Sequence, residues 1–99
     1  MEILGYTCKT TFWQDFTIAD RFGEEAVQDT YDRAIKEWGN DQIYGTELAL
    51  VLNWKCHYHY ETGEDELSRL YWELWEEFDN YVLDNWQGEK LKYYLKTTD

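Results

Sequence analysis

The sequence contains no proline, only two cysteines and few cations. Nine lysines and arginines stand against 21 aspartates and glutamates, so the formal net charge is −12 and the pI is near 4.4. A chain with this balance is not attracted to nucleic acid or to an anionic membrane, so direct binding of either is excluded on charge. It is attracted to basic surfaces, and salt weakens that attraction.

Three further absences bear on the fold and the cellular setting. No apolar run approaches the ~20 residues that a membrane-spanning helix needs. Cys8 and Cys56 follow neither a metal-binding nor a disulfide pattern, and no signal peptide is recognisable, so we expect a reduced, cytoplasmic setting. The absence of proline fits a helical domain with short connections.

Apolar and aromatic residues are well represented, at 43% and 19% of the chain. These fractions argue against disorder despite the high charge. At 99 residues there is room for one domain with a modest core, and no repeat or linker divides the sequence. Residues 1–99 are therefore predicted to form a single acidic helical domain.

Helical spacing recurs along the chain. A short first helix, capped by Thr10 or Thr11 and stopped by Gly23, has an apolar side. That side holds Phe12, Phe16, Ala19 and, where the helix continues, Phe22. The spacing predicts a second helix over residues 24–38 and a third that begins near Thr46, which can cap it.

The acidic stretch of residues 64–89 dominates the sequence. Its apolar residues recur at three- and four-residue spacing, which predicts one long amphipathic helix. They are Leu67, Leu70, Tyr71, Leu74, Phe78, Tyr81 and Val82. The same stretch holds nine carboxylates and one cation, Arg69, so it carries about eight net negative charges.

The predicted fold is mainly α, a compact bundle of about four helices. Residues 1–9 fit either a short strand or an extended arm. The tail of residues 90–99 fits either a strand that pairs with residues 2–7 or a final helical turn. The predicted core comprises Phe16, Val27, Tyr31, Ile35, Leu48, Leu52, Leu70, Leu74 and Phe78.

One run, Cys56-His57-Tyr58-His59, contains residue types that bind metals. On a helix Lys55, Cys56 and His59 share a face, but His57 points away, and structural zinc needs four converging ligands. We therefore expect packing residues and no metal site. With no phosphate-binding loop and no nucleophile placed beside a base, we also expect no catalytic residue, no cofactor and no enzymatic activity.

The acidic stretch has spacing that can imitate nucleic acid. Carboxylates four residues apart on a helix, such as Glu73 and Glu77, lie about 6 Å apart along the axis, close to the ~6–7 Å between successive phosphates of a DNA strand. The predicted partner-binding residues are Glu64, Asp65, Glu66, Glu73, Glu76, Glu77, Asp79 and Asp84, with Trp72 and Trp75 as aromatic anchors. The competing interpretation is a solvated face that keeps a small domain soluble, with at least half of the tryptophans in the core.

Several segments resemble a family of small acidic proteins encoded by phages and mobile elements of gut Firmicutes. The resemblance covers residues 11–99 and is carried by TFWQDFTIADRFG, ELALVLNWK, LYWELWEEFDNY and GEKLKYYLKTTD. It implies no catalytic motif. The acidity and genomic setting of the family are similar to those of anti-CRISPR and antirestriction proteins, many of which occupy the DNA-binding groove of a host nuclease.

These features lead to one functional expectation and two alternatives. We expect a phage or mobile-element inhibitor that binds the basic cleft of a host CRISPR-associated nuclease or restriction enzyme through a DNA-mimicking helical face. The first alternative is a non-enzymatic phage accessory protein that acts by self-association, as in a homodimer, or by another protein–protein contact. The second is a small enzyme or metal protein built on Cys56, His57 and His59.

Overall fold

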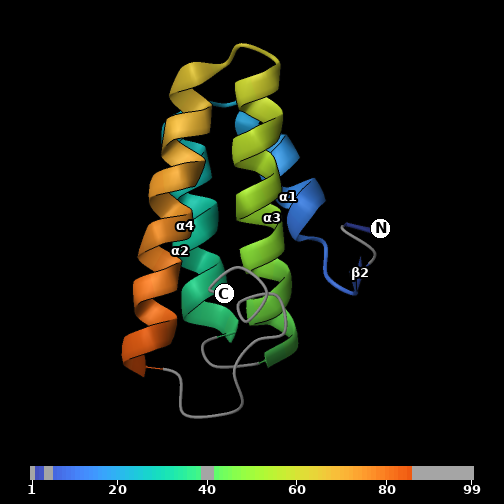
Figure 1. Ribbon diagram of the computed structural model, residues 1–99, viewed down its shortest axis with the longest axis vertical. Helices are drawn as coiled ribbons and strands as arrows, with labels where there is room; N and C mark the ends of the chain where they lie inside the picture. The colour runs from blue at the N-terminus through green and yellow to red at the C-terminus, as the bar shows by residue number, and fades with distance from the viewer. Residues whose placement is uncertain (1, 4–5, 39–41, 86–99) are drawn as a thin grey trace.

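The computed structural model describes residues 2–3, 6–38 and 42–85 of the chain. Its elements are, in order, β1 (Glu2–Ile3), β2 (Tyr6–Thr7), α1 (Phe12–Asp20), α2 (Glu24–Trp38), α3 (Gln42–Glu61) and α4 (Asp65–Asn85). The helices run alternately up and down, with α3 and α4 side by side and α1 and α2 packed against them (Figure 1). This is the mainly α bundle that the sequence predicts.

The end of α1 is set by Gly23, as predicted. Gly23 has a φ of +107°, a conformation that residues with a side chain rarely adopt. The N–H groups of Phe22 and Gly23 both donate to the carbonyl of Ala19, at 2.9 and 3.2 Å. The apolar side predicted for α1 is buried, but Phe22 is 78% exposed. The prediction for Phe22 is wrong because α1 ends at Asp20, so the helical period no longer orients Phe22.

The third helix, α3, begins at Gln42, one turn before the predicted start at Thr46. Thr46 is buried inside the helix, and Gly45 is accommodated although glycine costs roughly 1 kcal/mol in a helix interior. Residues 45–52 are buried on every side of the helix. Thr46 therefore packs inside the bundle and does not cap α3, and that is why the predicted start was wrong.

A buried carboxylate from α3 fixes the chain where it enters α1. Glu47 is fully buried. Its Oε1 accepts hydrogen bonds from the backbone N–H groups of Lys9, at 2.8 Å, and Thr10, at 2.7 Å. The Thr10 hydroxyl accepts from the N–H of Phe12 at 3.4 Å, whereas Thr11 makes no side-chain cap bond. A residue far along the chain thus completes a helix start that the sequence assigned to local capping.

The core lies around α3, which contacts α1, α2, α4 and β1. Seven of the nine predicted core residues are buried: Phe16, Val27, Tyr31, Leu48, Leu52, Leu74 and Phe78. Ile35 and Leu70 are partly buried and pack against that core. The helical periods of α2 and α4 therefore predicted the inward faces of these helices correctly.

The N-terminal strands pair with each other. β1 runs antiparallel to β2, with Glu2 opposite Thr7 and Ile3 opposite Tyr6. The predictions for the tail, and for residues 86–89 as part of the last helix, concern positions outside the described residues. Across residues 2–3, 6–38 and 42–85, no helix combines the length and the apolar character needed to span a bilayer.

Candidate functional site

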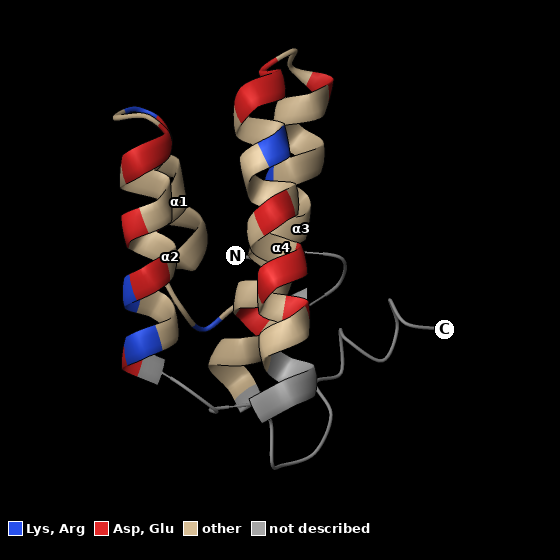
Figure 2. Cartoon of the chain, turned by 90° about the vertical axis from the view of Figure 1, so that its left-hand side faces the viewer, with Lys and Arg blue, Asp and Glu red and all other residues tan. Residues whose placement is uncertain are grey.

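The predicted partner-binding carboxylates lie on α4 and in the turn before it. Those whose side chains are exposed are Glu64, Asp65, Glu66, Glu73, Glu76 and Glu77. Asp79 is half-buried, and Asp84 belongs to the last turn of α4. Arg69 is the only lysine or arginine in the sequence of α4. Acidic segments accordingly recur along the helix, with one basic segment among them (Figure 2).

Three of these carboxylates share one side of α4. Glu66, Glu73 and Glu77 are seven and four residues apart, which corresponds to about 10 and about 6 Å along the helix axis. Tyr71 and Phe78 occupy another side and are buried in the core. The three carboxylates therefore form a row that projects from the bundle.

Helix α2 adds negative charge next to this row. Tyr31 of α2 is buried, and burial raises the pKa of its phenol; the carboxylates of Glu77 and Asp32 raise that pKa further. One carboxylate from α4 and one from α2 therefore lie close to the same hydroxyl. Figure 2 shows acidic segments along both helices on the side turned to the viewer. The acidic face thus extends over two helices, whereas the sequence predicted one.

We use the name acidic face for Asp65, Glu66, Glu73, Glu76 and Glu77 of α4 together with Asp32 of α2. Among the described residues, ion pairs within 4.0 Å join Asp20 to Lys55, Asp20 to His59, and Glu64 to His59. No described lysine or arginine lies within that distance of a carboxylate of the acidic face. Its charge is therefore available to a basic partner.

The two predicted aromatic anchors differ in exposure. Trp72 is 44% exposed, whereas Trp75 is half-buried and packs against the core. Their ring centroids are 5.5 Å apart. Trp72 can therefore contact a partner directly, and Trp75 supports it from the core side.

A buried polar cluster joins α1, α3 and α4. The Lys55 side chain is 2% exposed, and its ammonium donates to Asp20 Oδ2 at 3.0 Å and to Thr17 Oγ1 at 2.6 Å. The same Nζ lies 4.4 Å from the ring centroid of Trp13, a cation–π distance. The Tyr71 hydroxyl donates to the other oxygen of Asp20. Lys55 is therefore held inside the bundle and does not offset the charge of the acidic face.

His59 completes this cluster. Its Nε2 lies 2.9 Å from Asp20 Oδ2 and its Nδ1 3.0 Å from Glu64 Oε1, so each ring nitrogen is within hydrogen-bonding distance of a carboxylate. The pKa of Glu64 is lowered, mainly by its hydrogen bond with His59 and to a smaller extent by the hydrogen bond from Thr62. Burial, together with the hydrogen bond to Asp20, raises the pKa of Tyr71. Glu64, predicted as a partner-binding residue, is thus also engaged within the chain.

Sequence reasoning placed Lys55 and His59 on one face of α3 but missed their partner Asp20. Two cationic side chain types on a buried helix face require a carboxylate, because an unpaired buried charge is costly. That requirement is the signal that could have led to Asp20. No local pattern marks Asp20 itself, which lies 35 residues before Lys55.

The residues of the cysteine–histidine run do not converge. Cys56 is buried, with its Sγ 3.7 Å from the Ser68 hydroxyl, while His57 is exposed and His59 belongs to the buried cluster. Over the part of the chain that the structure describes, no group of three or more His, Cys, Asp and Glu is arranged to hold a metal ion.

Comparison with protein-family models, curated proteins and solved structures found no match for this chain. The function is therefore inferred from the chemistry of the residues themselves.

Proposed function

We propose that this protein is a phage or mobile-element inhibitor of a host defence nuclease, either a CRISPR-associated nuclease or a restriction enzyme. Its acidic face occupies the basic groove in which the nuclease binds nucleic acid. It acts in the cytoplasm of the bacterial host, in a fixed ratio to its target, without a cofactor and without catalysing a reaction.

The row of exposed carboxylates on α4 carries this proposal. In the described part of the chain these groups have no lysine or arginine partner, so a basic groove can attract them at full strength. Glu73 and Glu77, about 6 Å apart along the axis, approach the spacing of phosphates on one strand. Because packing in the bundle holds α4 in a fixed position, the nuclease can bind these carboxylates without the energetic cost of deforming a nucleic acid.

A cleavage assay tests the proposal. Purified protein is titrated into a guide-loaded CRISPR nuclease and into a set of restriction enzymes, and cleavage of target DNA is followed. Inhibition is expected to saturate at a fixed molar ratio, to be relieved by excess target DNA, and to weaken about tenfold or more between low and high salt. Inhibition that ignores salt, or with which DNA does not compete, contradicts mimicry.

Charge reversal locates the contact. The triple variant Glu73→Lys, Glu76→Lys and Glu77→Lys is expected to lose inhibition while its circular dichroism stays helical. A matched control, Glu24→Lys, Glu25→Lys and Glu61→Lys, changes the net charge equally at exposed sites outside the acidic face. If both triple variants lose inhibition equally, only net charge matters, and if the first still inhibits, this patch is not the contact.

A second candidate, self-association of a phage accessory protein, is favoured by the exposed ring of Trp72. A dimer formed through Trp72 shows twice the monomer mass in light scattering, and Trp72→Ala converts it to monomer. Such a dimer without affinity for a nuclease selects this candidate over the inhibitor.

A further inference from the structure

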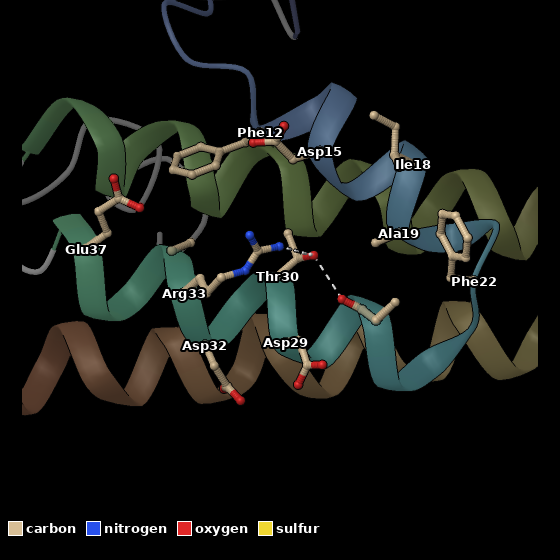
Figure 3. Close-up of a pocket in the computed structure, with 12 residues that line it drawn as sticks. Phe12, Asp15, Ile18, Ala19, Phe22, Asp29, Thr30, Asp32, Arg33 and Glu37 are labelled. Atoms are coloured by element: carbon tan, nitrogen blue, oxygen red, sulfur yellow. Dashed lines mark hydrogen bonds between the residues drawn. The ribbon is translucent and has the colours of Figure 1, made fainter.

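A groove of about 720 Å³ runs along the outer surface of the bundle between α1 and α2 (Figure 3). Its floor is formed by small side chains, with Ala19 on α1 and Ala26, Thr30 and Ala34 on α2. The Thr30 hydroxyl donates to the carbonyl of Ala26 at 2.8 Å, so it is already hydrogen-bonded. Small residues at every fourth position of α2 leave open space above one side of that helix.

Two large apolar side chains border the groove and are left uncovered. Ile18 is 54% exposed, and Phe22, at 78%, is the most exposed large hydrophobic residue of the described chain. The backbone of Phe22 is held by its hydrogen bond to Ala19 and by the turn at Gly23. An exposed aromatic side chain on a fixed backbone, next to an apolar floor, is typical of a protein-binding surface.

The groove has acidic sides. Asp29 and Asp32 lie along its α4 side, Asp15 lies on α1, and Glu37 stands near one end (Figure 3). Arg33 is the one cation among the lining residues, and it donates to the Thr30 hydroxyl at 3.4 Å. Four carboxylates against one guanidinium make the lining net negative, so the groove favours an occupant with lysine or arginine beside an apolar strip.

We propose that this groove binds an amphipathic helix of a partner protein, apolar on one face and basic along its flanks. Ala26 and Glu37 are eleven residues apart on α2, so the groove extends about 16 Å, or about three turns of a bound helix. Such a helix presents apolar side chains at i, i+3 or i+4, and i+7, which match an apolar floor of this length.

The structure and charge of the groove disfavour other kinds of ligand. Its two sides are helices whose backbone groups bond within the helix, so an extended peptide finds no sheet edge to pair with there. The carboxylates oppose nucleic acid and anionic lipid. They equally oppose the same face of a second copy, whose charge has the same sign.

The inference goes beyond the proposed function, because the groove between α1 and α2 shares only Asp32 with the acidic face and contains none of its α4 carboxylates. The probe is a labelled peptide of about 18 leucines and lysines with leucines at helical spacing, long enough to form a helix when bound. Fluorescence anisotropy at low salt is expected to show saturable 1:1 binding. A peptide of equal composition with alternating leucine and lysine, which lacks a helical apolar face, is expected to bind at least about tenfold more weakly.

Variants of the groove supply the decisive comparison. Ile18→Ala with Phe22→Ala removes exposed side chains, so the fold is retained, and is expected to weaken binding about tenfold or more. Ala26→Leu, which fills the floor, is expected to do the same. Tyr60→Ala is the matched control, because Tyr60 is 72% exposed and lies outside the groove, and it is expected to change affinity less than about twofold.

Three outcomes overturn the inference. The first is equal binding of the helical and alternating peptides, which indicates charge attraction alone. The second is unchanged affinity in both groove variants. The third is a dimer in light scattering that Phe22→Ala converts to monomer, which assigns the groove to a second copy. The variant Glu73→Gln, Glu76→Gln and Glu77→Gln separates the two proposals, because it is expected to impair nuclease inhibition but to keep peptide affinity within about threefold.

Discussion

Tyr31 shows how the acidic face acts on a single side chain. The residue is 2% exposed, and burial and the carboxylates of Glu77 and Asp32 raise the pKa of its phenol. A group whose pKa is higher in the folded state stabilises the fold below its unfolded pKa, which for tyrosine is about 10, and loses that contribution as the pH rises further. The protein therefore loses stability in alkaline solution partly through Tyr31.

Replacement of Tyr31 with phenylalanine tests this sign. At pH 7 the variant is expected to unfold in urea within about 1 kcal/mol of the wild type, because only one hydroxyl is removed. Between pH 10 and about pH 12, its unfolding free energy is expected to fall less steeply. Tyr60→Phe, at an exposed site, is the control and is expected to follow the wild type. A steeper alkaline loss in Tyr31→Phe contradicts the assignment.

Glu47 and Asp20 mark the limit of prediction at the residue scale. The sequence correctly predicted an exposed row of carboxylates on α4, because an apolar stripe at helical spacing leaves the remaining positions to solvent. It did not predict that Glu47 and Asp20 are largely removed from solvent, since their partners lie 35 to 51 residues away. From composition alone, both carboxylates would be assigned to the surface, because only the packing of the helices shows that they have little access to water.

At the scale of elements, Asp20 ties three helices together. It lies at the end of α1, pairs with Lys55 and His59 of α3, and accepts from Tyr71 of α4. Its carboxylate is 12% exposed and Lys55 only 2%, so the pair has little access to water. Removing one partner of such a pair leaves the other charge buried without compensation.

Asp20→Ala is therefore expected to lower the unfolding free energy by about 3–5 kcal/mol in urea denaturation. Asp29→Ala, which removes an exposed carboxylate from α2, is the control and is expected to change it by less than about 0.5 kcal/mol. If the two variants unfold alike, the cluster does not hold the helices together. The double variant Asp20→Asn with Lys55→Met is expected to recover part of the loss, because both charges are gone.

The predictability of each element follows from how it is buried. α2 and α4 have one apolar side and one polar side, so their periods located both the helix and its inward face. α3 is buried on every side over residues 45–52, so its sequence lacks a polar side from which the start could be located. The sequence did not predict the groove between α1 and α2 for another reason. Phe22 is exposed because α1 ends at Asp20, two residues before it, and the sequence does not locate the end of a helix that accurately.

At the scale of the whole molecule, the net charge of −12 opposes folding by self-repulsion. The molecule measures 35 × 26 × 23 Å. The electrostatic screening length is ~30 Å at 0.01 M salt, which is similar to these dimensions, and ~3 Å at 1 M salt, which is much smaller. Repulsion therefore acts across the entire bundle in dilute salt and only between neighbours in concentrated salt. The buried pair of Asp20 and Lys55 is screened much less.

Added sodium chloride is accordingly expected to raise the melting temperature, by an amount on the order of 5 °C between 0.01 and about 0.5 M. Calorimetry or circular dichroism at 222 nm measures this. The variant Glu73→Gln, Glu76→Gln and Glu77→Gln carries less charge and is expected to melt higher in dilute salt and to respond less to salt. A melting temperature that falls with salt shows that intramolecular attraction outweighs the repulsion.

The central position of α3 bears on how such a protein changes over generations. Among the described residues, α3 touches every other helix and supplies six of the fifteen buried hydrophobic residues, more than any other helix. The outward positions of α2 and α4 can then accumulate substitutions without refolding the chain. If the protein is the proposed inhibitor and a host alters the groove of its nuclease, substitutions at these surface positions can restore the fit, and the sequence of α3 is then expected to change more slowly than the charged positions of α2 and α4.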